Sequence, residues 1–193
     1  MSITLPLVPQ SQQQITFTSS AVENTPSYAG GRQRIARLGD RFKVDVTCRS
    51  LSYTQAATVV SKLLQGSNQT VLVPVAQPGL SVGAPGSPVI ASAATGGTTI
   101  TVSGFTSGYS VKEGQYFSVV HGGKRFLHLV TEAKTVSGTT TLKIFPTLRT
   151  PVAVNDVLEF AQPYLEGFLP ITQNWSVGLA QTVGLTFSVE ESL

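Results

Sequence analysis

The stretch from Arg41 to Gly66 reads RFKVDVTCRSLSYTQAATVVSKLLQG and changes its hydrophobic period once along its length. In its first half, apolar residues alternate strictly with polar ones, and the apolar positions are Phe42, Val44, Val46 and Cys48. A period of two is typical of a strand with one buried face. The pattern therefore predicts a half-buried β-strand, with Cys48 as a small buried hydrophobic residue.

The second half of this stretch changes to a helical period. Ser52 is followed three residues later by Gln55, which is the spacing of a capping box. The apolar residues that follow at helical spacing are Ala56, Val59, Val60, Leu63 and Leu64. We expect a helix of about 12 residues that ends at Gly66 as its C′ residue. Because a short helix with one apolar stripe is marginal alone, it must lie against a sheet.

Outward from this stretch, short strands are expected along most of the chain. Before residue 76 they cover 15–18 and 70–75; residues 1–14 are interpreted as an arm or a short edge strand, and 19–31 as a loop. Residues 77–97 are rich in proline and glycine and are taken as a linker or long loop at a domain boundary. Five short strands are expected after it, at 98–103, 116–120, 126–130, 139–144 and 157–161. Two more are expected at 175–179 and 183–189.

These strands predict a mainly β protein in two parts. Residues 1–75 and 162–193 would form a β-sandwich or barrel domain with one short helix. Residues 76–161 would form an inserted small β-barrel, and a five-stranded barrel of the OB kind fits the strand count. Insertions of this kind enter at exposed loops.

The composition favours a protein that packs against neighbours. Charged residues make up 12% of the chain, against about 25% in ordinary globular proteins.

The single cysteine excludes an internal disulfide, and the first 14 residues lack the pattern of a signal peptide. No apolar run approaches the ~20 residues of a membrane helix. We therefore expect synthesis in a reducing cytoplasm and no membrane partner.

No spacing in the sequence indicates catalysis. The two histidines, His121 and His128, belong to no zinc-binding pattern, and no nucleophile motif is present. Glycine pairs lack the following helix that a phosphate loop needs. The sequence therefore predicts no enzyme activity, no cofactor and no metal.

One cluster of basic residues covers positions 32–49; it consists of Arg32, Arg34, Arg37, Arg41, Lys43 and Arg49. It is interpreted as a solvated strand face or as a subunit contact. In the contact, Arg32, Arg34 and Arg37 would meet Glu190 and Glu191 of another copy. A nucleic-acid interface would need interleaved aromatic residues for base stacking. The only one nearby, Phe42, is expected to be buried, so no specific nucleic acid is predicted.

Several short segments of the sequence form a recognisable series. They are Gly30–Arg34 leading into Arg41–Val46, the helix ending at Lys62–Gly66, the segments Val111–Val119, Phe126–Val130 and Thr141–Arg149, and the closing Trp175 with Leu185–Glu191. Together they resemble distal tail proteins of long-tailed, non-contractile bacteriophages. The likeness is one of layout and short phrases, and it covers most of the chain.

The resemblance implies a structural virion protein. Such proteins form a ring, usually of six copies, that joins the tail tube to the tip or baseplate hub, and their N-terminal β domain builds the ring. The implied partners are other copies of the chain, the tube protein, and the hub and tape-measure proteins of the tail tip. The implied location is the virion tail. An additional barrel of the OB kind on the outside of the ring occurs in some members.

Two alternatives remain open at this point. The chain could form another ring of the tail, either a terminator or a tip component. It could instead be a carbohydrate-binding module that contacts the host surface through aromatic residues of the barrel. The candidate stacking residues are Tyr109, Tyr116 and Phe117.

Overall fold

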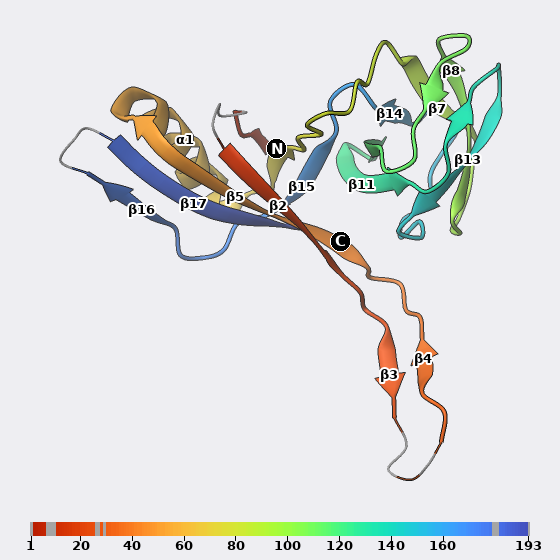
Figure 1. Ribbon diagram of the computed structural model, residues 1–193, viewed down its shortest axis with the longest axis horizontal. Helices are drawn as coiled ribbons and strands as arrows, with labels where there is room; N and C mark the ends of the chain where they lie inside the picture. The colour runs from red at the N-terminus through yellow and green to blue at the C-terminus, as the bar shows by residue number, and fades with distance from the viewer. Residues whose placement is uncertain (1, 7–10, 26–27, 29, 179–181, 193) are drawn as a thin grey trace.

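The computed structural model describes residues 2–6, 11–25, 28, 30–178 and 182–192. It is mainly β, as predicted, and contains one helix of more than one turn among the described residues. A sheet with a helix against it lies beside a closed barrel, and a hairpin projects away from both (Figure 1). Among these residues, no helix combines the length and the apolar character needed to cross a bilayer.

The larger sheet is built from both ends of the chain. Its strands are β1 (Ile3–Thr4), β2 (Ser11–Thr18), β5 (Arg41–Ser52), β6 (Val71–Pro74), β15 (Tyr164–Phe168), β16 (Asn174–Val177) and β17 (Thr182–Glu191). The order is β1-β6-β15-β17-β5-β2, and β16 pairs with β17 beside this path. Among the strand pairs of the described residues in this sheet, β1 and β6 are the parallel one. The predicted strand around Val44 thus lies between β17 and the edge strand β2, with Val44 opposite Val189.

The alternation in β5 is confirmed. Its four alternating apolar side chains are all buried, and burial raises the pKa of the Cys48 thiol. The strand is longer than predicted because its pairing with β17 continues to Ser52, where the helix begins. The last strand and the first long strand therefore share one core.

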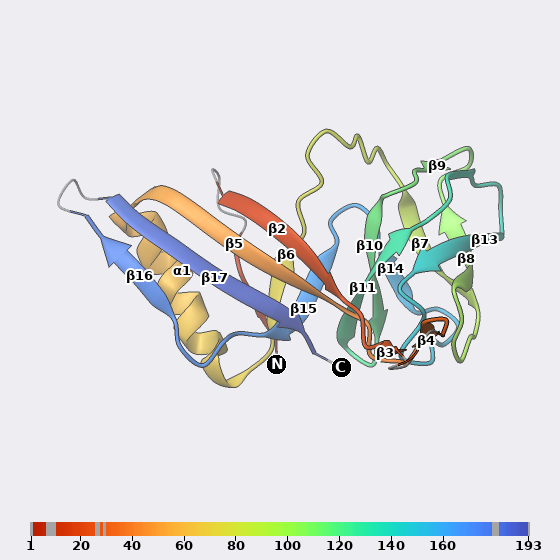
Figure 2. The ribbon, with the colours of Figure 1, turned by 60° about the horizontal axis from the view of Figure 1, so that its bottom comes forward.

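The capped helix is also confirmed, as α1 (Tyr53–Gln65). The hydroxyl of Ser52 accepts a hydrogen bond from the Gln55 backbone N–H at 3.4 Å, and the Gln55 side chain accepts one from the Ser52 backbone N–H at 3.3 Å. One side of the helix, with Ala56, Val59 and Leu63, is buried against β5 and β17. The helix covers one face of the sheet (Figure 2).

Gly66 is needed for a reason other than the one the sequence suggested. Its φ is −76°, so it is right-handed, and it begins the short 3₁₀ turn η1 (Gly66–Asn68). The prediction of a C′ glycine is therefore wrong, because such a residue is left-handed. A Cβ at this position would lie 2.3 Å from Cγ1 of Val71. Close packing of the turn against β6 explains the glycine.

The second part is a closed barrel of six strands, one more than the predicted five. They are β7 (Gly86–Ser92), β8 (Thr99–Phe105), β10 (Tyr116–His121), β11 (Lys124–Val130), β13 (Thr140–Phe145) and β14 (Val157–Glu159). All lie within 76–161, and they close in the order β10-β11-β13-β8-β7-β14. The extra strand, β7, falls in the segment expected to be a linker. A short pair, β9 (Ser110–Val111) and β12 (Lys134–Thr135), stands outside the barrel.

The expected loop at 19–31 contains a strand instead. Strands β3 (Val22–Asn24) and β4 (Gln33–Ile35) pair as an antiparallel hairpin that projects from the molecule (Figure 1). We call this hairpin the arm. Its base is fixed by Asp40, whose Oδ1 accepts hydrogen bonds from the Ser20 backbone N–H at 2.8 Å and from the Ser19 hydroxyl at 3.1 Å.

Strand β15 has no counterpart in the sequence-based prediction. It reads YLEGF, so a glutamate and a glycine interrupt the apolar pattern of a strand. The glycine is required by its neighbour: a Cβ on Gly167 would lie 2.0 Å from the backbone oxygen of Glu190. The glutamate, Glu166, is buried and holds the two parts of the molecule together, as described next.

Candidate functional site

The barrel packs directly against the larger sheet, and we call this contact the junction. Strand β11 lies against β15 (Figure 2). Three barrel residues, Tyr116, Leu127 and Phe145, join the core of the sheet. The ring of Tyr116 meets that of Phe42 edge-on, with centroids 5.9 Å apart. The two parts thus share a continuous apolar contact.

A buried carboxylate, Glu191, binds three separate segments at the junction. It accepts hydrogen bonds from the backbone N–H of Leu127 at 2.9 Å and of Phe42 at 3.1 Å. It also pairs with Nη2 of Arg149 at 2.5 Å, and the two side chains are 0% and 5% exposed. The prediction that Glu191 contacts another copy is wrong, because its carboxylate is enclosed within its own chain.

A second buried carboxylate, Glu166, binds the same barrel strand β11 two residues before the contact of Glu191. It accepts hydrogen bonds from the Arg125 backbone N–H and from the Thr70 hydroxyl, both at 2.9 Å. The Arg125 guanidinium in turn holds Glu159 through two parallel hydrogen bonds of 2.9 Å. The hydrogen bond to Glu159 raises the pKa of Arg125. Such bidentate pairs fix geometry as well as charge.

His128 lies inside the barrel and is held neutral. Its ring is buried and stacks on Phe117, with centroids 5.9 Å apart. Burial, and next to it the charge of Arg149, lowers the pKa of His128 to about 3. The neutral ring therefore donates from Nδ1 to the backbone oxygen of Pro146, at 3.1 Å. This is the geometry of a structural histidine.

The other histidine makes a surface pair. Nδ1 of His121 lies 2.7 Å from Oδ2 of Asp156, which also accepts a hydrogen bond from the Ala153 backbone N–H. Within the part of the chain that is described, no cluster of three or more metal-binding side chains occurs. The prediction that the chain is not an enzyme stays a prediction.

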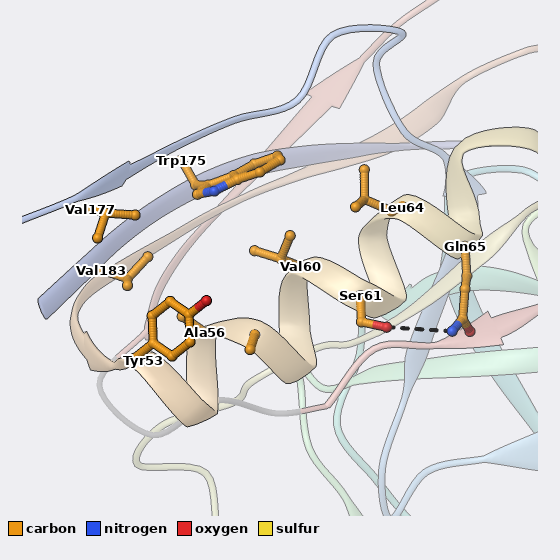
Figure 3. Close-up of a pocket in the computed structure, with 10 residues that line it drawn as sticks. Tyr53, Ala56, Val60, Ser61, Leu64, Gln65, Trp175, Val177 and Val183 are labelled. Atoms are coloured by element: carbon orange, nitrogen blue, oxygen red, sulfur yellow. Dashed lines mark hydrogen bonds between the residues drawn. The ribbon is translucent and has the colours of Figure 1, made fainter. Parts of the chain in front are cut away.

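At the far end of the sheet, an apolar groove of about 630 Å³ runs between α1 and β16 (Figure 3). Its lining consists of Tyr53, Ala56, Ala57, Val60, Ser61, Leu64, Gln65, Trp175, Val177 and Val183. No lining residue is charged. Leu64 and Val177 are 52% and 62% exposed, so large apolar side chains of this groove remain in contact with solvent.

Trp175 and Tyr53 stand on opposite walls of this groove (Figure 3). Both aromatic side chains are exposed. The sequence analysis did not select either residue as a site. The sequence feature that could have indicated this groove is the apolar stripe of α1. The sheet covers only part of this stripe, because Val59 and Leu63 are buried whereas Leu64 is exposed.

The arm carries the second exposed apolar surface. Tyr28, Ile35 and Leu38 are exposed, and Leu38 is 71% exposed. Of the predicted basic contact residues, Arg32 lies 3.9 Å from Glu23 on the same arm, and Arg34 and Arg37 are exposed. The structure therefore brings the three arginines together on one projecting hairpin.

The predicted acidic partner Glu190 is engaged within the chain. Its carboxylate pairs with Nε of Arg41 at 2.5 Å, and both side chains are partly exposed. The side chains of the two neighbouring glutamates therefore lie in different environments. The Glu190 side chain is about half exposed, at 49%, whereas the Glu191 side chain is buried in the junction.

The three candidate sugar-stacking residues do not form a platform. Phe117 is 0% exposed and packs on Phe160 in the barrel core, so its assignment is wrong. Tyr116 belongs to the junction, where burial raises its pKa. Tyr109 stacks on Phe105 with centroids 5.5 Å apart, and its hydroxyl donates to the backbone oxygen of Val82.

No known protein family matches this chain, and no curated protein is significantly similar to it in sequence. The geometry defines the class: a mainly β protein in which a barrel is fixed to a sheet, with an open apolar groove and a projecting arm.

Proposed function

We propose that this chain is a structural subunit of a bacteriophage tail, in the ring that joins the distal end of the tail tube to the tip hub. The phrases of sequence that resemble distal tail proteins support this proposal. The arrangement supports it as well, since a β domain formed by both chain ends carries a small barrel within it. This is the layout that the resemblance implies.

The observation that carries the proposal is a pair of different, unpartnered apolar surfaces. The groove lies beside α1 at one end of the sheet, and the arm leaves the sheet elsewhere (Figure 1). When a chain binds copies of itself through two different surfaces, the copies associate head to tail. Such contacts form a ring when the rotation from each copy to the next adds up to a full turn. Because the groove contains no charge, covering it requires no desolvation of ions.

The edge strand β2 supports the same interpretation. It ends the strand order of the sheet, and its sequence SQQQITFT contains no charge and no proline. Edge strands of monomeric proteins are usually protected by charged residues or proline, because a bare edge pairs with other chains. The Gln13 side chain bonds the backbone of Pro74 and Ala76. An edge of eight residues without charge or proline suits a subunit that meets copies of itself.

In this proposal six copies form the ring, with the tube protein on one side and the hub and tape-measure proteins on the other. The location is the virion tail, after synthesis in the cytoplasm of the bacterial host. The alternative of another tail ring, a terminator or a tip component, shares the same surfaces. The carbohydrate-binding alternative is weaker, because Phe117 is buried and Tyr116 is partly buried in the junction.

The test measures assembly of the purified chain. We expect rings in negative-stain images and a hexamer mass in solution. The double variant Ile35→Ser and Leu38→Ser should remove apolar contacts of the arm and leave monomers, whereas Val154→Ser, an equally exposed change on the barrel side, should still assemble. A wild-type chain that stays monomeric at high concentration and is absent from purified tails would refute the proposal.

A further inference from the structure

One edge of strand β16 lies open beside the groove. Among the described residues β16 pairs with β17 alone, so its other edge has no partner. All four of its residues are exposed, and its sequence NWSV contains no charge and no proline. Alternate residues of such an edge direct their backbone N–H and C=O groups away from the sheet. The edge is therefore available for hydrogen bonds with an added strand.

A strand added to β16 would extend over the groove. Trp175 and Val177 line the groove from β16, and α1 borders it on the other side (Figure 3). Because side chains alternate between the two faces of a sheet, every second side chain of the added strand would lie on the same face as Trp175 and Val177. The lining carries no charge. The occupant therefore needs an extended backbone with one uncharged, partly apolar face.

The arm has such a face. Four uncharged side chains share one face of its hairpin: Val22, Asn24, Gln33 and Ile35. Of these, Val22 and Ile35 are directly opposite one another and are 40% and 46% exposed. Glu23 and Arg34, the pair between them, lie on the other face. Among the described residues β3 and β4 pair only with each other, so each strand of the arm also has an open edge.

Other exposed apolar residues on strands are less suited to this role. Phe168 lies on β15, which is paired with β6 on one side and β17 on the other. Val157 lies on β14, which is paired with β10 and β7. Phe17 lies on the edge strand β2, but its ring packs on those of Phe42 and Phe145, with centroids 5.7 and 4.8 Å away. The arm combines exposed apolar side chains with an open strand edge.

The arm of the same copy lies away from the groove. It leaves the sheet at the end that adjoins the barrel, whereas α1 and β16 lie at the opposite end (Figure 1, Figure 2). An arm that occupies the groove must therefore come from another chain.

We propose that the arm of a second copy binds as an added strand along β16 and covers the groove with its uncharged face. Glu23 and Arg34 remain in water on the other face, so no charge is buried. Each copy then gives its arm to one neighbour and its groove to another, which is a head-to-tail contact. This inference rests on the proposed function, because it names the partner of the groove within the ring.

The test uses two full-length variants and the single tryptophan of the chain, Trp175. The groove variant, Trp175→Asp, places a charge in the groove, removes the fluorescence signal and keeps the arm. The arm variant, Ile35→Ser with Leu38→Ser, keeps the groove and its tryptophan. Each variant alone should be monomeric. Mixing them should give a one-to-one dimer in sedimentation velocity and a saturable blue shift of the Trp175 emission.

The controls test which face of the arm binds and how. Adding Ile35→Ser to the groove variant should weaken the mixed dimer at least about fourfold, because the exposed part of this side chain is no longer covered. Arg34→Gln, one residue away on the other face, is the matched control and should leave the affinity unchanged. Amide hydrogen exchange of residues 174–177 should slow on binding, because an added strand supplies partners to the open edge. If Trp175→Asp does not fold, Trp175→Phe with Leu64→Asp takes its place.

Wild-type rings, together with variants that stay monomeric when mixed, would overturn this pairing and leave the ring proposal standing. A blue shift without slower exchange in β16 would overturn the added strand. Equal weakening by Ile35→Ser and Arg34→Gln would overturn the assignment of the face. A wild-type chain that never associates would refute both the pairing and the ring.

Discussion

The junction and the groove are two surfaces of the same sheet domain, and they are constructed in opposite ways. At the junction, two buried carboxylates, Glu166 and Glu191, are saturated by backbone N–H groups, hydroxyls and an arginine. The groove between α1 and β16 contains no charged residue, and its apolar side chains lie open.

This difference separates a permanent contact from an available one. A buried charge is tolerated only when its partners are in place, so a surface with such charges cannot be exposed and covered repeatedly without cost. An uncharged apolar surface can remain exposed to water, and covering it with a partner is favourable in free energy. We infer that the barrel is a fixed part of the folded chain, whereas the groove is kept for a partner.

The largest expected effect comes from breaking the junction. Glu191→Gln keeps the shape of the side chain but removes the charge that compensates Arg149. Removing one member of a buried ion pair leaves the charge of the other uncompensated. We therefore expect a loss of about 3–5 kcal/mol in the free energy of unfolding. Chemical denaturation at pH 7 measures it.

The neighbouring residue provides the control. Glu190→Gln removes an acid from a partly exposed pair with Arg41, and exposed pairs contribute at most about 1 kcal/mol. Equal losses in the two variants would contradict the assignment of Glu191 to a structural junction.

A smaller effect is expected from pH, through His128 beside the junction. In the folded chain the pKa of His128 is about 3, against 6.5 for a free histidine, so the unfolded state binds more protons below pH 6.5. This contribution is complete above pH 6.5 and is lost as pH falls toward 3. Between pH 7 and pH 5 we expect a decrease of about 2 kcal/mol.

The variant His128→Gln tests this slope. The glutamine amide can still donate a hydrogen bond, but it does not titrate, so unfolding free energies measured at pH 7 and pH 5 should lie about 2 kcal/mol closer together than in the wild type. An unchanged slope would assign the pH dependence to other groups.

Sequence analysis predicted the groove wall better than the junction. Strand β5 and helix α1 were recognisable because their signals are local: a period of two, then a capping box and a helical stripe within 26 residues, Arg41–Gly66. The junction depends on partners far apart in the chain. Glu191 binds the backbone of Phe42, 149 residues away, and of Leu127, 64 residues away. No short pattern records such pairings.

The missed strands have related physical causes. In β7, Gly86 with a φ of +85° and Pro88 two residues later are typical of a loop, yet barrel closure pairs this segment with β8 and β14. In β15, Glu166 breaks the apolar pattern because it is a buried acid with specific donors. The partners of Glu166 make it part of the core, and they lie too far away in the sequence for a local pattern to record them.

The smallest expected effect on stability concerns the groove between α1 and β16. Leu64→Ser changes a residue of the groove that is 52% exposed, so the unfolding free energy of the monomer should stay within about 0.5 kcal/mol of the wild type.

Assembly should respond quite differently. Burial of the exposed half of this side chain by a partner contributes about 0.8–1.5 kcal/mol, which corresponds to about 4- to 12-fold weaker association when it is lost. Lys62→Ser, on the same helix but outside the groove lining, is the matched control and should assemble normally. Sedimentation velocity over a concentration series separates the two quantities. If Leu64→Ser assembles as well as the wild type, the groove is not a contact surface, and its apolar lining needs another explanation.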